Sequence, residues 1–144
     1  MADKQPEYVR MVCNTETFCP CYTAEVRWLD WDMDFEMARE AWAVHGIALA
    51  KELWLDFRDS GYTYCGVIAD GKIVSSAAVF TRIETEWEAA AVWTLEGYRK
   101  LGYGKSVVSF VTQNILDAGR LATCHTGADN IAMQSTACSV GYLR

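Results

Sequence analysis

One stretch of the chain, residues 98–106, combines glycines with basic side chains in a spacing that could bind an anion. The apolar run 89–95 before it has the length of a buried strand, and residues 106–116 after it have helical spacing. Gly102 and Gly104 permit positive φ and leave the backbone open, so successive N–H groups can converge on an anion. The start of the helix adds the positive end of its dipole. Three basic residues lie in the same stretch: Arg99, Lys100 and Lys105. The stretch therefore predicts a phosphate cradle.

The same residues also fit an ordinary turn between a strand and a helix. The spacing excludes two familiar phosphate motifs. A Walker loop requires a lysine where this chain has Tyr103, and a dinucleotide fingerprint requires a third glycine where it has Val107.

Metal binding is not favoured by the cysteines or the acidic residues. The spacing of Cys13, Cys19 and Cys21 is not that of a structural zinc site, and no histidine lies near them. The other three cysteines lie in apolar sequence and are expected to be small core residues with free thiols: Cys65, Cys124 and Cys138. Asp30, Asp32 and Asp34 lack the glycine and glutamate of a calcium loop, so a role at a helix start is expected instead. We expect no metal.

Length and composition favour one well-packed domain. The chain has 144 residues, of which 51% are hydrophobic, and its net charge is −6. This charge argues against a nucleic-acid partner and mildly favours a cationic one, such as an amine. No apolar run reaches the roughly 20 residues of a membrane span, and residues 1–5 do not resemble a secretory signal. We therefore expect a cytoplasmic protein with no membrane contact.

The predicted elements form a mixed sheet of an α/β protein. Residues 64–69 and 72–81 alternate as strands around Asp70-Gly71, a strong hairpin signal. A strand over 87–95, a helix that reaches residue 118 before Gly119 and a strand over 121–126 make a right-handed parallel crossover. Earlier, we predict strands over 8–12 and 25–29 and helices over 35–43 and 47–58, with His45 between the helices as a packing or capping residue.

Two motifs carry a resemblance to a known family. Residues 92–104 match its cofactor loop through Arg99, Gly102 and Gly104, and residues 130–134 with Gly141 and Tyr142 match its later asparagine segment. In this order and separation they resemble the GNAT acetyltransferase superfamily, in particular its small single-domain branch. The resemblance covers about residues 62–142, whereas the residues before it match nothing firmly.

The resemblance implies a GNAT-like domain over residues 1–144, in which 1–61 form the acceptor side and 62–144 bind acetyl-CoA. It implies an N-acetyltransferase that moves an acetyl group to a primary amine of a small molecule or peptide. The Val92 N–H would polarise the thioester, Trp93, Thr94 and Asn130 would contact the pantetheine arm, and the next loop would bind the pyrophosphate. That loop comprises Arg99, Lys100, Leu101, Gly102, Tyr103, Gly104 and Lys105. The early tryptophans could wall the acceptor pocket, but core packing is expected for most of them: Trp28, Trp31, Trp42 and Trp54.

Acetyl transfer to an amine requires a base, since an amine with a pKa near ~10 is protonated at neutral pH. Glu88 is the candidate, because it lies eleven residues before Arg99, as in the histone acetyltransferase branch of the family. Regular alternation places Glu88, Ala90, Val92 and Thr94 on one face of their strand. Glu88 could act directly or through water, and the alternative is a solvated residue at the strand end.

The chain departs from the family pattern at two places. Many members have a tyrosine that acts as the general acid at the position of Ala137 in this chain. Ser135 or Tyr142 could substitute for that tyrosine. The motifs also end at Tyr142, where the family continues into a last strand. Residues 8–12 could fill that sheet edge, a second copy could fill it in a homodimer, or it could stay open. A non-catalytic acyl-CoA-binding domain is the main alternative function, and a nucleotide-binding protein without a link to CoA is a third.

Overall fold

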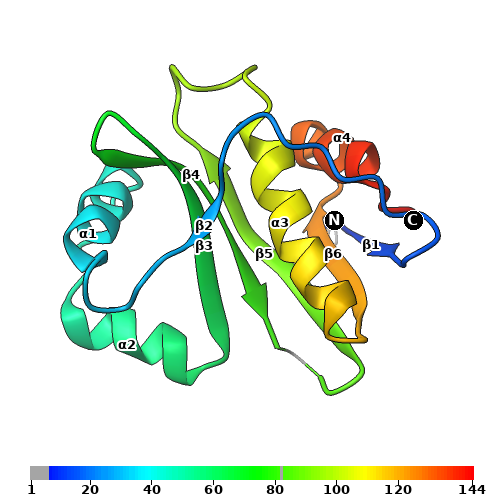
Figure 1. The fold of residues 1–144 in the computed structure, drawn as a ribbon, viewed down its shortest axis with the longest axis horizontal. Helices are drawn as coiled ribbons and strands as arrows, with labels where there is room; N and C mark the ends of the chain where they lie inside the picture. Colours follow the sequence, from blue (N-terminus) through cyan, green and yellow to red (C-terminus); the bar gives the residue numbers. More distant parts are fainter. Residues whose placement is uncertain (1–6, 82) are drawn as a thin grey trace, which may run out of the picture.

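The computed structural model describes residues 7–81 and 83–144, so residues 1–5, where the sequence predicts no secretory signal, lie outside the described part. Figure 1 shows a mixed sheet flanked by helices. The strands are β1 (Tyr8–Cys13), β2 (Arg27–Trp28), β3 (Tyr62–Ala69), β4 (Lys72–Phe80), β5 (Glu86–Thr94) and β6 (Leu121–Gly127). The helices are α1 (Phe35–Val44), α2 (Lys51–Asp59), α3 (Tyr103–Asp117) and α4 (Ile131–Val140).

The sheet has the order β1-β6-β5-β4-β3-β2 and is mixed, as predicted. Only β5 and β6 pair in parallel among the described strands, and every other pair is antiparallel. Strand β1 occupies the edge beside β6, which confirms the first of the three alternatives for that edge. Leu143 then pairs with Val12 on the outer side of β1 through backbone hydrogen bonds of 2.7 and 2.8 Å. The amino-terminal strand thus fills the position for which a second copy of the chain was the other possible occupant.

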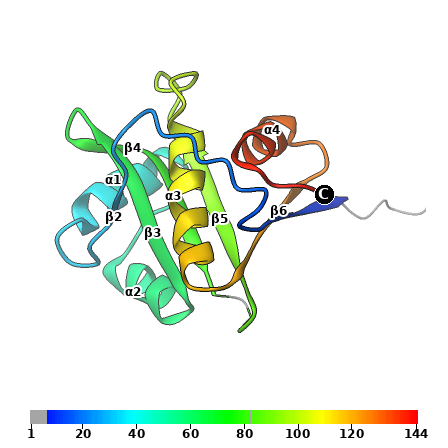
Figure 2. The ribbon, with the colours of Figure 1, turned by 45° about the vertical axis from the view of Figure 1, so that its right-hand side comes forward.

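Helices cover both faces of the sheet (Figures 1 and 2). On one face, α3 packs on β3 to β6, and α4 packs on α3 and β6. The core on this side is built from apolar residues of α3 and the strands, such as Val108, Val111 and Ala89. On the other face, α1 contacts β4 and α2 contacts β3 over a second core that contains Trp42 and Trp54. Core packing is therefore confirmed for these two tryptophans.

The turns agree with local sequence signals, whereas two elements are shorter than predicted. Asp70 and Gly71 both have positive φ, 54° and 74°, as a two-residue hairpin turn requires. The predicted strand over 25–29 is reduced to Arg27–Trp28. The second helix begins at Lys51 instead of residue 47, because the chain leaves α1 through Gly46 and runs extended at Ala50 (ψ 156°). This path places Leu49 in the core and leaves Ile47 exposed.

Helix ends and cysteines also differ in detail from the prediction. Asp34 stands at the N-cap of α1 but makes no cap bond, because its carboxylate binds Arg27 instead. Burial of Cys65 and Cys124 is confirmed, and it raises the pKa of both thiols to about 12. The prediction is wrong for Cys138, which is exposed because α4 turns Ala137 and Val140 toward the core.

Candidate functional site

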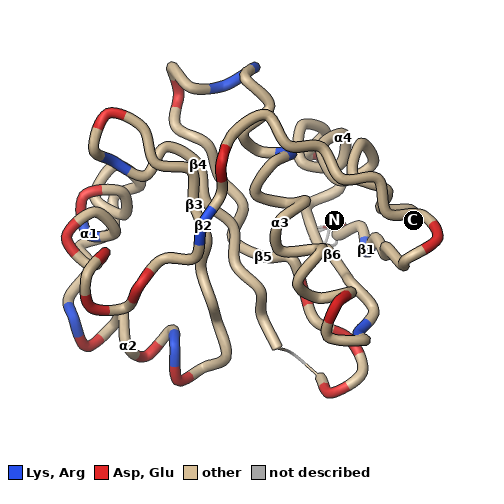
Figure 3. The backbone as a smooth tube through the Cα atoms, in the orientation of Figure 1, with Lys and Arg blue, Asp and Glu red and all other residues tan. Residues whose placement is uncertain are grey.

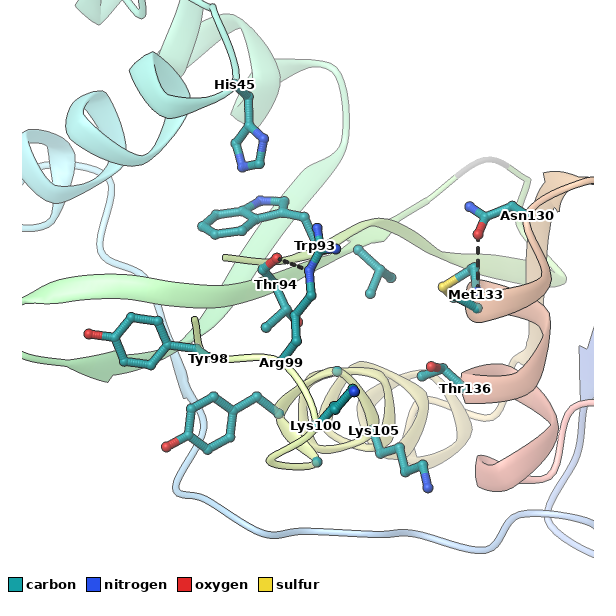
Figure 4. Close-up of a pocket in the computed structure, with 15 residues that line it drawn as sticks. His45, Trp93, Thr94, Tyr98, Arg99, Lys100, Lys105, Asn130, Met133 and Thr136 are labelled. Carbon is teal, nitrogen blue, oxygen red and sulfur yellow. Dashed lines mark hydrogen bonds between the residues drawn. The ribbon is translucent and has the colours of Figure 1, made fainter. Parts of the chain in front are cut away.

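A cavity of about 630 Å³ lies where β5 ends, α3 begins and α4 starts (Figure 4). Its walls come from α1, β5, the loop after β5, the first turn of α3 and the first half of α4. They comprise His45, Val92, Trp93, Thr94, Tyr98, Arg99, Lys100, Gly102, Tyr103, Gly104, Lys105, Asn130, Ala132, Met133 and Thr136. Among these described wall residues three are basic and none is acidic. The cavity is therefore suited to an anionic ligand.

The strands β5 and β6 part beside this cavity. Their parallel pairing runs from Glu86 opposite Leu121 to Glu88 opposite Thr123, and β5 then continues to Thr94. Ala91 has a φ of +52°, and the register with β4 shifts at the same place, so β5 carries a bulge there. The prediction of one common face for residues 88, 90, 92 and 94 is therefore wrong. Before the bulge Ala89 packs on the α3 side, and after it Val92 does, whereas Trp93 packs on the opposite face.

Helix α3 begins at Tyr103, earlier than the run from residue 106 had indicated. The backbone N–H groups of a first helical turn have no acceptor within the helix. Here that turn contains Tyr103, Gly104 and Lys105, all of which line the cavity. The guanidinium of Arg99 donates to the Thr94 carbonyl at 3.4 Å, which anchors the loop to the end of β5. The helix start thus presents amide donors and positive charge to the cavity.

Gly102 and Gly104 are required by different neighbours, and for Gly102 this corrects the prediction that its missing Cβ leaves the backbone open to an anion. Gly102 is the N-cap of α3 with a φ of +80°, and a Cβ on it would lie 2.6 Å from Thr23 Cγ2, outside the cavity wall. Thr23 belongs to a segment that runs across α3 (Figure 1), where its hydroxyl donates to the Leu101 carbonyl at 2.7 Å. A Cβ on Gly104 would instead lie 3.6 Å from Thr94 Oγ1 and 3.9 Å from Thr136 Cγ2, which are both wall residues. Of these two glycines, Gly104 is the one at which an added Cβ would contact other wall residues of the cavity.

The predicted cofactor residues lie together around the cavity, with one exception. Leu101 is not in the wall, and its side chain is about half exposed. Asn130 caps α4, since its Oδ1 accepts the Met133 amide at 3.1 Å, and this bond orients the side chain beside the cavity (Figure 4). Sequence reasoning gave no cofactor role to several wall residues, namely Tyr98, Ala132 and Met133, which lie within its two motifs, and Thr136, which lies outside them. Met133 and Thr136 lie three and six residues after Asn130, and this helical spacing is the signal that could have found them.

His45 also lines the cavity, from the end of α1. It is the C-cap of that helix, as predicted, and its ring lies 4.8 Å from that of Trp93 in an edge-on arrangement. Figure 4 shows the two rings at the opposite end of the view from Lys105. Trp93, rather than the earlier tryptophans, thus provides the indole in the wall.

Glu88 lies outside the cavity wall, next to a residue that sequence reasoning did not single out. Its Oε1 is 3.2 Å from Nδ1 of His125 on β6, 37 positions further along the chain. The Glu88 side chain is 13% exposed and the His125 side chain is 28% exposed. Alternation in the predicted strand 121–126 could have placed His125 on the face of Thr123, but not opposite Glu88.

Neither of the suggested substitutes for an acidic tyrosine reaches the cavity. Tyr142 is fully buried and its hydroxyl bonds Thr112 at 2.7 Å, and burial raises its pKa. Ser135 is exposed on α4 outside the wall, and Ala137 is buried. The α4 hydroxyl that does line the cavity belongs to Thr136.

Figure 3 shows that acidic residues are concentrated on and around α1 and α2, where basic residues also occur, and that basic residues lie in the loop between β5 and α3. Within the described residues, no group of three or more His, Cys, Asp and Glu side chains could hold a metal ion. None of the helices described is both long and apolar enough to cross a membrane.

Comparison with solved structures shows which fold this is. A candidate GNAT acetyltransferase from Novosphingobium aromaticivorans DSM 12444 superposes with a TM-score of 0.74 at 20% identity, covering 94% of this chain and 58% of its own. A GNAT acetyltransferase from Colwellia psychrerythraea also superposes with a TM-score of 0.74, at 15% identity, and the match covers 96% of this chain and 53% of that protein. The chain therefore spans a little more than half the length of these two proteins.

A third structure was solved with a ligand. AAC(6')-Iy, in complex with the bisubstrate analogue CoA-S-monomethyl-acetylneamine, gives a TM-score of 0.66 at 14% identity, over 83% of this chain and 90% of its own. At such identities these similarities establish the fold alone. Among curated proteins, none matches the chain significantly in sequence. The model of the acetyltransferase (GNAT) family, however, matches residues 23–142, and the chain therefore belongs to the GNAT acetyltransferase family.

Proposed function

We propose that the protein is an acetyl-CoA-dependent N-acetyltransferase whose acceptor is a primary amine of a small molecule or peptide. The observation that carries this proposal is the cavity at the start of α3. It combines unpaired first-turn amides, three basic side chains and a glycine, Gly104, whose missing Cβ keeps the backbone accessible. Such a site fits the pyrophosphate of a CoA thioester. The CoA analogue bound to AAC(6')-Iy, a protein of the same fold, supports this choice of ligand.

The parted strands fit the remainder of the ligand. Because β5 leaves β6 after Glu88, the later peptide groups of β5 are accessible for hydrogen bonds with the pantetheine arm. Trp93 and Thr94 would provide these groups, and Asn130 would add its side-chain amide. The Val92 N–H would stabilise negative charge on the thioester oxygen, because it follows the bulge and borders the cavity.

The acceptor would approach from the side of α1, where residues 1–61 contribute His45 to the cavity wall. The amine must first lose a proton, and we assign Glu88 as the base that removes it. Glu88 would act through a water molecule, because it lies outside the cavity wall. The nitrogen then bonds to the acetyl carbon while the carbon–sulfur bond breaks, and the second proton that this nitrogen must lose to become an amide passes to solvent. The thiolate takes its proton from solvent, because Tyr142 is buried and Ala137 replaces the family's tyrosine.

Two measurements test this function. Calorimetric titration with acetyl-CoA should show binding, and incubation with acetyl-CoA and a panel of primary amines should release CoA thiol. Glu88→Gln should keep the binding and lower the release. The absence of a tyrosine at Ala137 favours one other function, a non-catalytic acyl-CoA-binding domain. That alternative predicts binding without thiol release from any amine, and a wild type that does not bind acetyl-CoA would refute both.

A further inference from the structure

Glu88 and His125 face one another at the point where β5 and β6 part. Glu88 belongs to the last parallel pair, opposite Thr123, and His125 stands two residues further along β6. The gap between His125 Nδ1 and Glu88 Oε1 is 3.2 Å, which is within hydrogen-bonding distance. Both side chains are shielded from solvent for most of their surface. A hydrogen bond in this place is therefore less exposed to competition from water than one at the surface.

The pair lies on the sheet face opposite α3. Ala89, Ala122 and Cys124 pack into the core under α3, so their neighbours in sequence, Glu88 and His125, point to the other face. That is the face on which Trp93 packs, with His45 against its ring. The bulge at Ala91 places Glu88 and Trp93 on one face despite their odd spacing. The pair thus shares the side from which the acceptor would approach.

Strand β1 supplies the neighbouring charges. Arg10 stands directly opposite His125 in the antiparallel register, and its guanidinium binds Glu86 at 2.7 Å. Arg10 and Glu86 therefore neutralise one another beside the pair. The Glu88 carboxylate lies next to Nδ1 of His125, and this contact favours an imidazole whose Nδ1 carries the hydrogen and donates it to the carboxylate.

We propose that His125 is a positioning residue for Glu88, an inference that rests on the proposed function. The imidazole donates its Nδ1–H to Oε1 and holds the carboxylate in one orientation before the acceptor binds. The proton of the acceptor's ammonium group then passes to Glu88, which becomes a neutral acid, and later to solvent. The His125 hydrogen stays on Nδ1 throughout, since the oxygen that accepts it can do so in both charge states of Glu88.

Orientation matters here because a glutamate side chain has several rotatable bonds, and misplacing a reacting group by about 1 Å can lower a rate about 100-fold. His125→Ala should therefore lower kcat by about 10- to 100-fold. The KM for acetyl-CoA should remain unchanged, since the cavity walls belong to other residues. His125→Asn is the matched control, because the asparagine amide nitrogen can stand where Nδ1 stands and donate the same bond. It should restore kcat to within a few-fold of wild type.

The kinetic test measures CoA thiol release from acetyl-CoA with the best primary amine of the panel. The double variant Glu88→Gln/His125→Ala should be no slower than Glu88→Gln alone, because the two residues act as one unit. The inference is overturned if His125→Ala matches the wild type, or if His125→Asn is as slow as His125→Ala. If the wild type acetylates no amine, the proposed function itself fails and this inference falls with it.

A spectroscopic test needs no acceptor. The chain contains two histidines, so the imidazole nitrogens of His125 can be assigned by comparison with His45→Gln. Nitrogen-15 NMR of the free wild type should show neutral His125 as the Nδ1–H tautomer. Glu88→Leu should return it to the Nε2–H form. A wild type with the hydrogen on Nε2 would overturn the inference even if Glu88→Gln abolishes turnover.

Discussion

Replacing Gly104 by alanine should make the free protein more stable and its binding of acetyl-CoA weaker. Gly104 lies in the first turn of α3, and its φ is not among the positive ones. The added Cβ would lie 3.6 Å from Thr94 Oγ1 and 3.9 Å from Thr136 Cγ2, which are ordinary contacts. Alanine within a helix is more stable than glycine by about 0.5–1 kcal/mol. At about 2–4 °C per kcal/mol, the melting temperature should rise by about 1–4 °C.

The loss of affinity follows from where that methyl group lies. Both of its nearest neighbours are wall residues, so it occupies space beside the amides at which the phosphates are expected. A hydrogen bond to a charged group contributes about 1.5–3 kcal/mol. The loss of one such bond lowers affinity about 10- to 100-fold, since about 1.4 kcal/mol corresponds to a factor of ten.

Gly102→Ala is the matched control and should change stability in the opposite direction. At a φ of +80° the left-handed backbone costs alanine about 1–2 kcal/mol. Its Cβ would also lie 2.6 Å from Thr23 Cγ2, and overpacking of this kind costs about 1–3 kcal/mol more. Urea unfolding followed by tryptophan fluorescence gives the stabilities, and calorimetry gives the affinities. A Gly104→Ala variant that binds acetyl-CoA as tightly as the wild type would refute the assignment of the cradle.

Three further predictions concern the core, an ion pair and the basic loop. Tyr142→Phe should lower the free energy of unfolding by about 1–3 kcal/mol, because it leaves the Thr112 hydroxyl buried without this partner, and thiol release should not change; a large loss of kcat would restore Tyr142 as an acid. The Arg27 guanidinium, with a smaller contribution from the Asp30 amide, lowers the pKa of Asp34 in the folded protein. The ionised Asp34 therefore stabilises the fold at pH values above its pKa in the unfolded chain, about 3.9. This stabilisation is lost as the pH falls through the lower pKa of the folded state. Urea unfolding between about pH 6 and 3 should therefore show a weaker dependence on pH in Asp34→Asn than in the wild type, and identical slopes would contradict this. Added salt should weaken acetyl-CoA binding several-fold by screening Arg99, Lys100 and Lys105, and calorimetry that finds no salt dependence would mean that these charges do not face the ligand.

Local sequence signals predicted the elements that depend on adjacent residues. The hairpin at Asp70-Gly71 requires only that two consecutive residues adopt positive φ. The helix that ends at Gly119 likewise depends on one residue in the left-handed region, at 75°. The predicted start of the second helix at residue 47 was wrong, because the chain there is extended and buries Leu49 in the core. Helical periodicity does not reveal such a tertiary contact.

The candidate site follows the same division. Most of the cavity wall at the start of α3 could be predicted because its glycines, basic residues and helix start are close together in the chain. The contact between Glu88 and His125 could not be predicted, because it depends on how the parallel strands β5 and β6 are aligned with one another. The bulge at Ala91 reversed the predicted face of Val92, because a single extra residue shifts every later side chain of a strand to the other side.

The sequence by itself thus indicated the family, the order of the strands and the helix between residues 62 and 126, and most of the residues that line the cavity at the start of α3, because each depends on motifs or turns within a few positions. The tertiary structure alone decided three further features: β1 closes the sheet edge beside β6, Thr23 rather than a ligand requires Gly102, and His125 meets Glu88. Each of these joins segments that are far apart in the chain. Contacts of that kind depend on the packing of the whole sheet, which no local pattern encodes.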